Sequence, residues 1–177
     1  MDTVNNARTM PWKVAIEPFR VAPRVWYVGN TWVGSFLIQT SEGLALIDTT
    51  VMEDLYLLID SIHRLGFDPK DLKHIFLTHA HMDHDGAARA LKELTGAKVW
   101  LSREDEEWRH RPEADMSDTG FSIVPYETDC FYEDETPIVM GDVVIRTRLS
   151  AGHTPGTTSF FVEMKDEEGK TVVWGMH

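Results

Sequence analysis

The chain has 177 residues, a length that suits one domain with a sizeable core. Its 17 basic and 29 acidic side chains give a net charge of −12, which argues against nucleic acid or an anionic membrane as a partner. One cysteine, Cys130, excludes an internal disulfide, and no run approaches the roughly 20 apolar residues of a membrane span. We therefore expect a globular protein whose partner is a small-molecule substrate.

Residues 1–24 carry no recognisable targeting signal. Pro11, Pro18 and Pro23 interrupt what apolar character the segment has, and no apolar run reaches the length of a signal peptide. We expect an irregular arm over residues 1–24, then one domain over residues 25–177, and a cytoplasmic location for the chain as written. A periplasmic or secreted location stays open, because a signal peptide removed upstream would leave no trace here.

Strand-like segments dominate the next part of the chain. Residues 25–28 and 34–39 are predicted to pair, and a turn at residues 41–43 leads into a third strand that ends at Asp48. A helix is predicted over residues 53–65, because apolar side chains recur there at helical spacing: Leu55, Leu58, Ile59 and Ile62.

A short apolar strand over residues 74–78 runs into a loop with four potential metal ligands. The loop reads His-Ala-His-Met-Asp-His, and neutral imidazole and carboxylate are natural ligands of Zn²⁺. In an extended stretch His79 and His81 point the same way, and a turn after them would bring Asp83 and His84 toward a neighbouring point. A loop between a strand and a helix is also where α/β proteins place chemistry. The loop therefore predicts a catalytic metal site with two adjacent metal positions.

The elements after this loop alternate between helix, strand and turn. A helix over residues 87–94, a strand over residues 98–101 and a helix capped by Ser102 come first. Residues 111–135 are polar and are predicted to form a long loop over the site. Two hairpins follow, over residues 138–149 and 160–174. Three acidic runs are expected to be solvated: residues 104–107, 133–135 and 166–168.

A second histidine motif follows the strand-like run at residues 143–149. It reads Ala-Gly-His-Thr-Pro-Gly from Ala151 to Gly156 and places His153 between two glycines and a proline. Glycines let backbone approach closely, and the proline fixes the turn. Beside the first cluster, His153 is a candidate for the third nitrogen ligand.

Together these segments resemble the metallo-β-lactamase superfamily. The His-x-His-x-Asp-His loop at residues 79–84 matches the signature of that family, and the run around His153 matches its next ligand. The sequence Leu-Ile-Asp that ends at Asp48 matches the end of an early strand of the family. The resemblance implies an α+β fold, an αββα sandwich that begins at about residue 25.

The resemblance also implies the metals and their ligands. Two Zn²⁺ ions are expected per chain, the first held by His79, His81 and His153. Asp83 and His84 would belong to the second, and Asp83 would also be catalytic, because it would orient the nucleophile.

Asp48 would steady the metal loop from behind, and an ordinary aspartate in a turn at a strand end is the alternative interpretation. Zn²⁺ lowers the pKa of bound water from about 15.7 to about 7, so hydroxide becomes available at neutral pH. The resemblance implies that this hydroxide attacks a carbonyl carbon while the metals stabilise the oxyanion. No Ser-His-Asp triad is then required.

Members of the superfamily differ after the strand predicted over residues 171–174. Glyoxalase-type thioesterases and many lactonases carry Gly-Asp there, and the commonest β-lactamase subclasses use a cysteine nearby, whereas this sequence reads Gly175-Met176-His177. The chain most resembles the β-lactamase subclass that lacks a cysteine ligand and completes its second metal with a later histidine. We expect a zinc-dependent hydrolase of β-lactam amides. A thioester, lactone or phosphodiester hydrolase of the same fold, and an inactive metal-binding domain, are the alternatives.

Members of this family usually continue well beyond the position of His177. We therefore expect an incomplete C-terminal half, with the last ligand of the second Zn²⁺ missing from this sequence. His177 is interpreted as an incidental residue, and a substitute metal ligand is the alternative. An incomplete sandwich would expose apolar surface and strand edges, so we expect either a homo-oligomer or a poorly stable chain.

Overall fold

Seven strands form the first sheet of the computed structural model, which describes residues 2–177. The three pairings from the first strand to the fourth are antiparallel, and the three from the fourth to the seventh are parallel. Across the sheet the strands follow the order of the chain: β1 (Phe19–Ala22), β2 (Val25–Tyr27), β3 (Phe36–Thr40), β4 (Gly43–Ile47), β5 (Leu72–Phe76), β6 (Lys98–Leu101) and β7 (Cys130–Phe131).

Four antiparallel strands form the second sheet, and they confirm the two predicted hairpins. Gly141, with φ of 61°, supplies the left-handed turn of the first hairpin. From one edge to the other the strands are β11 (Thr171–Met176), β10 (Thr158–Lys165), β9 (Val143–Leu149) and β8 (Ile138–Met140).

Helices connect the parallel strands of the first sheet, as predicted for this part of the chain. The helix expected over residues 53–65 begins as a 3₁₀ turn (Met52–Asp54) and continues as α2 (Leu55–Arg64), and Gly66 follows with φ of 85°. No helix among residues 2–177 is long and apolar enough to cross a membrane. The other helices are α1 (Thr3–Thr9), α3 (Met82–Asp85), α4 (Ala88–Thr95) and α5 (Arg103–Trp108), and further 3₁₀ turns span Pro11–Lys13, Pro69–Asp71, Pro112–Ala114 and Ser117–Thr119.

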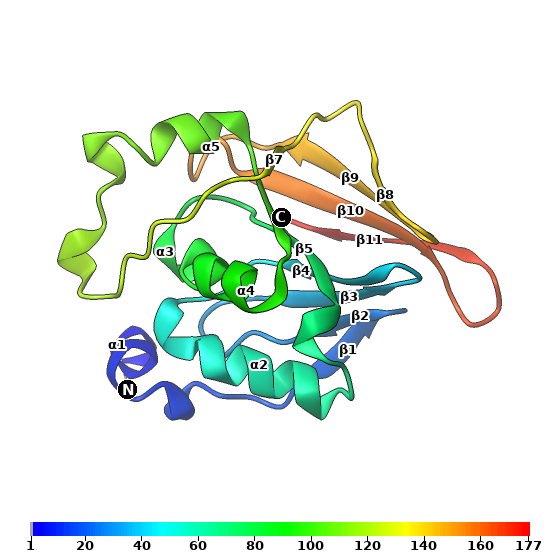
Figure 1. Cartoon of the computed structure of the whole chain (residues 1–177), viewed down its shortest axis with the longest axis horizontal. Coiled ribbons are helices and arrows are strands. Elements are labelled where there is room, and N and C mark those ends of the chain that lie inside the picture. Colours follow the sequence, from blue (N-terminus) through cyan, green and yellow to red (C-terminus); the bar gives the residue numbers. More distant parts are fainter. Residues whose placement is uncertain (1) are drawn as a thin grey trace.

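The core has two parts, one on each face of the first sheet. On one face Leu46 and Ile75 pack against Leu58 of α2 and Leu91 of α4, which cover this side of the sheet (Figure 1). Central strands buried on both faces read as continuous apolar runs, as Leu44–Ile47 of β4 does.

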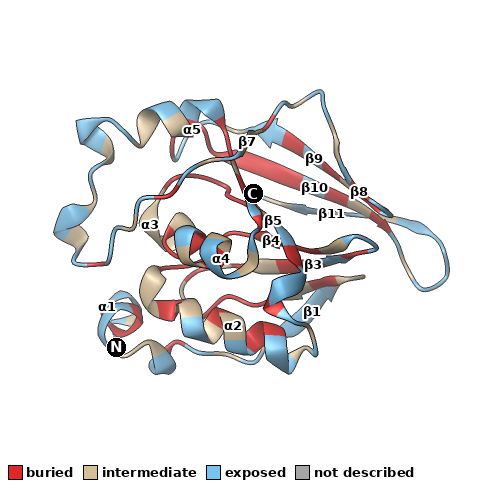
Figure 2. Ribbon diagram, in the orientation of Figure 1, coloured by how far each residue is buried: buried red, intermediate tan, exposed pale blue. Residues whose placement is uncertain are grey.

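The opposite face of the first sheet packs against the second sheet. Ile47 and Phe76 meet Ile145 and Phe160 there. Figure 2 shows the buried positions as a red band along β10. Helix, sheet and sheet are thus stacked in layers, which confirms the α+β sandwich expected from the sequence.

The outer face of the second sheet carries exposed apolar side chains. Val139, Phe161 and Val173 are 62%, 40% and 57% exposed, because alternation along each strand points them away from the core. The second helical layer of the expected αββα sandwich is therefore absent over these three side chains among residues 2–177.

The irregular arm expected over residues 1–24 is wrong in its local structure. Residues 3–9 form α1, which is capped by Asp2, and residues 19–22 form β1, which pairs with β2. The helix is short, but Ala7 is fully buried in a small cluster with Val51 and Phe121. Tertiary packing, which local sequence does not reveal, holds this segment in place.

Candidate metal centre

Strand β5 delivers the predicted metal loop to the edge of the sandwich. The strand ends at Phe76, the chain bends at residues 78–80, His81 is extended, and α3 begins at Met82. His81 caps this helix, because its carbonyl accepts from the backbone N–H of His84 at 2.8 Å. The chain turns here as the sequence predicted, so that Asp83 and His84 come back toward His79.

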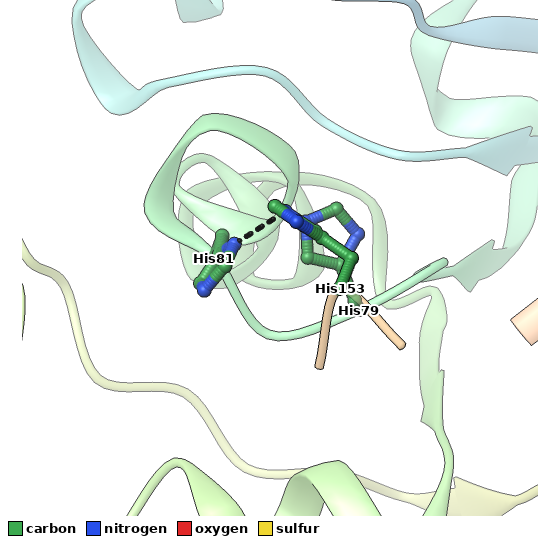
Figure 3. Close-up of side chains that lie close together, drawn as sticks. All are labelled: His79, His81 and His153. Atoms are coloured by element: carbon green, nitrogen blue, oxygen red, sulfur yellow. Dashed lines mark hydrogen bonds between the residues drawn. The ribbon is translucent and has the colours of Figure 1, made fainter. Parts of the chain in front are cut away.

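Three histidine rings meet at this point (Figure 3). The ring centroids of His79 and His81 are 4.8 Å apart, and that of His153 lies 4.7 Å from the first and 4.6 Å from the second. Nδ1 of His81 and Nε2 of His153 are 2.9 Å apart. One ligand atom from each of the three rings lies within 4.8 Å of the other two, close enough to hold one ion. The turn between β9 and β10 thus brings the 153 ring to the loop that follows β5.

Asp83 and His84 form a second group with His79. The ligand atoms of these three residues also lie within 4.8 Å of one another. His79 has a single free nitrogen, because its Nδ1 is 2.9 Å from Oγ1 of Thr78. The two groups therefore share one donor, and only one of them can have three donors at a time.

The hydrogen bonds around His79 fix its tautomer. Thr78 donates its only hydroxyl proton to Oδ2 of Asp48 at 2.8 Å, so its Oγ1 can only accept from Nδ1–H of His79. Nε2 of His79 is left with its lone pair, and it is buried without any hydrogen-bond partner. A buried and unpartnered imidazole nitrogen is costly unless a ligand satisfies it, so the residues present fit a metal ion.

Burial and the neighbouring rings keep these imidazoles neutral. Burial lowers the pKa of His79 to about 2, helped by the charges of His84, His81 and His153. Burial also lowers the pKa of His81, with His153 adding to the effect. Neutral imidazole is the form that binds a metal, so no proton has to be displaced from these two rings at neutral pH.

Asp48 is the buried anchor of the whole loop. Its side chain accepts from the backbone N–H and the hydroxyl of Thr78, and from Nδ1 of His84 at 2.8 Å. Burial alone would lower the pKa of His84, but the charge of Asp48 and this hydrogen bond raise it. The bond points Nε2 of His84 toward Asp83, whose Oδ2 is 3.6 Å away. Asp48 therefore holds Thr78 and His84 together through its buried side chain.

The backbone around Asp48 is strained. Asp48 and Thr50 have φ of 60° and 61°, in the left-handed region that β-branched residues such as Thr50 rarely adopt. Gly86 lets this segment approach α3, because a Cβ there would lie 2.9 Å from the backbone nitrogen of Met52 and 3.0 Å from Cα of Val51. The strained segment and α3 are thus locked together behind the ligands.

One acidic residue that sequence reasoning assigned to solvent is buried beside the site. Asp105, in the run 104–107, is 0% exposed and accepts hydrogen bonds from the backbone N–H groups of Ala80 and Gly156. Its neighbours Glu104 and Glu107 are exposed as expected. The predicted cap is confirmed, since Ser102 accepts from the backbone N–H of Asp105 at 3.2 Å. This serine followed three residues later by an acid was the only local signal for Asp105.

A cavity of about 420 Å³ adjoins the metal loop. Part of the segment 111–135, which the sequence placed over the site, forms one wall and includes Met116, Ile123 and Tyr126. Met82 and Asp85 also line the cavity, and Tyr126 donates to Asp85 at 3.0 Å. Burial raises the pKa of Asp85 to about 7, against the lowering effect of this hydrogen bond. The cavity has the size and the mixed lining of a small-molecule site.

The remaining histidines lie outside the two donor groups. His63 and His110 are exposed, and His74 accepts from the indole N–H of Trp100 at 2.9 Å. His177 is exposed and its Nδ1 is 2.7 Å from Oγ of Ser159, so it belongs to neither group. Of the eight histidines, only His79, His81, His84 and His153 lie in the two donor groups.

Known proteins share both the sequence pattern and the fold. The family described as "Metallo-beta-lactamase superfamily" matches residues 33–175. The crystal structure of the metallo-beta-lactamase GOB-18 from Elizabethkingia meningoseptica is 33% identical with a TM-score of 0.85, over 95% of this chain and 63% of that one. BJP-1, a subclass B3 metallo-beta-lactamase of Bradyrhizobium japonicum, is 28% identical with a TM-score of 0.85, over 94% of this chain and 64% of that one.

Among curated proteins, the N-acyl homoserine lactonase AttM of Agrobacterium fabrum is 28% identical over 121 residues. The match covers 62% of this chain and 43% of the lactonase. The chain thus spans less than two-thirds of the length of each of these three relatives. The family match over residues 33–175 covers most of the chain, and the sandwich fold and the histidine loop agree with it. The chain therefore belongs to the metallo-β-lactamase superfamily.

Proposed function

We propose that the chain is a zinc-dependent hydrolase in which His79, His81 and His153 hold one Zn²⁺. The observation that carries this proposal is the convergence of three imidazoles from two separate segments on one point, with Nε2 of His79 buried and unpartnered. Three nitrogen donors with a further position left for water or substrate are the usual protein ligands of a catalytic zinc ion.

Asp83 and His84 are proposed to contribute to a second Zn²⁺. With His79 committed to the first ion, these two residues supply two donors, so the second position needs a further donor from outside the cluster. The side chain of Asp83 is 24% exposed. Its carboxylate would accept a hydrogen bond from the attacking water and so orient it toward the substrate.

Bound zinc would supply a Lewis acid and a water of lowered pKa at the point where the three rings meet. The chain's own residues prepare that point. Burial keeps His79 and His81 neutral, Thr78 sets the tautomer of His79, and Asp48 aims His84. The adjoining cavity would hold the substrate, with Met82, Met116 and Ile123 offering apolar contacts to it.

The substrate class that we favour is a β-lactam. Two observations support it: the similarity of nearly the whole chain to the metallo-β-lactamases GOB-18 and BJP-1, and the sequence itself, which has no cysteine in the cluster and has Met176 rather than an aspartate after Gly175. A lactone is the second candidate, because the relative AttM is named an N-acyl homoserine lactonase. Both are cyclic carbonyl compounds opened by the same attack, and they differ in whether an amine or an alcohol leaves.

A substrate panel tests the proposal directly. Zinc-loaded protein would be assayed with a chromogenic cephalosporin, an N-acyl homoserine lactone and a thioester, beside His79→Ala and the control His63→Ala, an exposed helix residue. We expect the cephalosporin to turn over, His79→Ala to lose zinc and activity, and His63→Ala to retain both. Preferred turnover of the lactone would favour the second candidate. Stoichiometric zinc with no turnover of any substrate would indicate a binding domain and refute the hydrolase.

A further inference from the structure

One buried carboxylate connects the two segments that carry the histidine cluster. Oδ2 of Asp105 accepts from the backbone N–H of Ala80 at 2.8 Å, and Ala80 lies between His79 and His81 in the chain. The same oxygen accepts from Oγ1 of Thr154, also at 2.8 Å, and Thr154 directly follows His153. Asp105 is therefore hydrogen-bonded to residues directly adjacent in the chain to His79, His81 and His153. It forms no hydrogen bond with any of these three rings.

The second oxygen of Asp105 strengthens the link to the turn that holds His153. Oδ1 accepts from the backbone N–H of Gly156 at 2.7 Å. A Cβ on Gly156 would lie 2.0 Å from Oγ of Ser102 and 2.5 Å from the nitrogen of Asp105, so only glycine lets the turn lie this close to the start of α5. Because Asp105 is 0% exposed, water does not compete for these three charge-assisted hydrogen bonds.

The ring of His153 depends on such an anchor. His153 is exposed, as are Ala151 and Gly152 before it, so little packing holds the tip of this turn. The strands on either side of the turn belong to the second sheet, whereas His79 and His81 follow a strand of the first. A backbone hydrogen bond from Thr158 to the carbonyl of Thr78, at 2.8 Å, also joins the two sheets nearby. That bond would keep the two sheets together if the carboxylate of Asp105 were lost. In the chain, however, Thr158 comes after Gly156, so the bond does not hold the residues next to His153.

We propose that Asp105 is a positioning residue for the metal site: by holding Ala80, Thr154 and Gly156 on one carboxylate, it sets the distance between the pair His79–His81 and His153. The proposal rests on the proposed function, since it requires that these three imidazoles bind one ion. Asp105 would touch neither metal nor substrate. Its contribution would be to preorganise the ligands, so its loss would weaken zinc binding more than it weakens the fold.

Asp105→Asn is the first test. The amide has the same shape, but its NH₂ group cannot accept, so either Gly156 N–H or both Ala80 N–H and Thr154 Oγ1 lose their acceptor, depending on which oxygen it replaces. We expect a 10- to 100-fold loss of zinc affinity, the range typical of residues that orient metal ligands, measured by competition with a chromogenic chelator on the full chain. The visible spectrum of the cobalt-substituted protein should change as well, because it reports the coordination geometry.

Asp129→Asn is the matched control. Asp129 also accepts from a backbone N–H, that of Val99 at 2.8 Å, and from Lys92, but it bonds to no residue of the cluster. We expect this variant to lose some stability and to keep the zinc affinity and the cobalt spectrum of the wild type. Asp129 is exposed, so the comparison separates positioning of the ligands from the general effect of replacing a carboxylate that accepts a backbone hydrogen bond.

Two substitutions at Thr154 keep the test decisive if Asp105→Asn does not fold. Thr154→Val removes the hydroxyl that donates to Asp105 and should lower zinc affinity several-fold. Thr154→Ser keeps this hydroxyl and should keep the zinc affinity of the wild type. The inference about Asp105 would be overturned if folded Asp105→Asn kept the zinc affinity and cobalt spectrum of the wild type. Equal zinc affinity in the two Thr154 variants would also overturn it. Either result would leave the proposed function standing. Failure of the wild-type protein to bind zinc would overturn the proposed function, and this inference with it.

Discussion

Thr78→Val tests how the protein prepares its buried histidine. Valine keeps the shape of the side chain and the backbone N–H that Asp48 accepts, but it removes the hydroxyl. That hydroxyl donates to Asp48 at 2.8 Å and accepts from Nδ1–H of His79 at 2.9 Å. The substitution therefore removes two buried hydrogen bonds and the group that fixes the tautomer of His79.

The expected loss of stability follows from the two hydrogen bonds that the substitution removes. A hydrogen bond to a charged group contributes about 1.5–3 kcal/mol, and a buried N–H without an acceptor costs about 1–3 kcal/mol. Because the ring of His79 can turn to recover part of this loss, we expect a decrease of about 3 kcal/mol in the free energy of unfolding of the metal-free protein. For a chain of this length that corresponds to a fall in Tm of about 6–12 °C. Zinc affinity should fall 10- to 100-fold, because Nε2 of His79 is no longer presented in a fixed orientation.

Two measurements on each variant check this reasoning. Thermal unfolding of the metal-free protein reports the hydrogen bonds, and chelator competition reports zinc affinity. Thr78→Ser is the control, because it keeps the hydroxyl and loses one methyl group, worth about 1 kcal/mol. The reasoning is refuted if Thr78→Val and Thr78→Ser bind zinc equally well.

Three further predictions concern the rest of the molecule. Gly86→Ala should lower the free energy of unfolding by about 1–3 kcal/mol in urea titrations, because the added Cβ meets the carbonyl oxygen of Met82 at 2.3 Å and the backbone nitrogen of Met52 at 2.9 Å; an unchanged midpoint would contradict these close approaches. Burial raises the pKa of Asp54 from 3.8 to about 7, so the folded state keeps a proton that the unfolded state releases. The wild type should therefore lose stability relative to Asp54→Asn as pH rises from about 4 to 7, by at most about 4 kcal/mol, and parallel pH curves for the two proteins would contradict this. Phe160→Ala should cost about 3–5 kcal/mol of unfolding free energy, whereas Phe161→Ala, on the exposed face of the same strand, should cost far less; similar losses would contradict the packing of the two sheets.

The metal loop could be predicted because its information is local. Four ligand-type side chains lie within six residues, and the turn that groups Asp83 and His84 follows from the strand that ends just before. His153 is 72 residues beyond His81, but its own motif of glycines and proline marked it, and the resemblance to a family supplied the pairing. Strands with clear alternation and the helix with a regular apolar face were likewise found close to their observed bounds.

The supports behind the ligands could not be predicted in the same way. Asp48 bonds to Thr78 and His84, which are 30 and 36 residues away, so sequence alone left two interpretations of it open. Asp105 stands in an acidic run that is typical of a solvated surface, and its burial depends on backbone N–H groups 25 and 51 residues away. Only tertiary contacts distinguish such a carboxylate from its exposed neighbours.

The N-terminal helix was missed for a related reason. A helix of seven residues is not stable by itself in water, and the prolines nearby are typical of irregular chain. It forms because Ala7 packs against Val51 and Phe121, which lie far along the sequence. Short elements stabilised mainly by such packing carry little signal of their own.

The central claim is that imidazoles from two separate segments bind one zinc ion. X-ray absorption at the zinc edge of protein loaded with one equivalent of Zn²⁺ tests it most directly, because the scattering pattern counts the imidazole ligands. We predict three imidazoles with Zn–N distances of about 2.0–2.1 Å in the wild type and two in His153→Ala. Equal imidazole counts in the two proteins would contradict the claim, since the ion would then be held without the segment that carries His153.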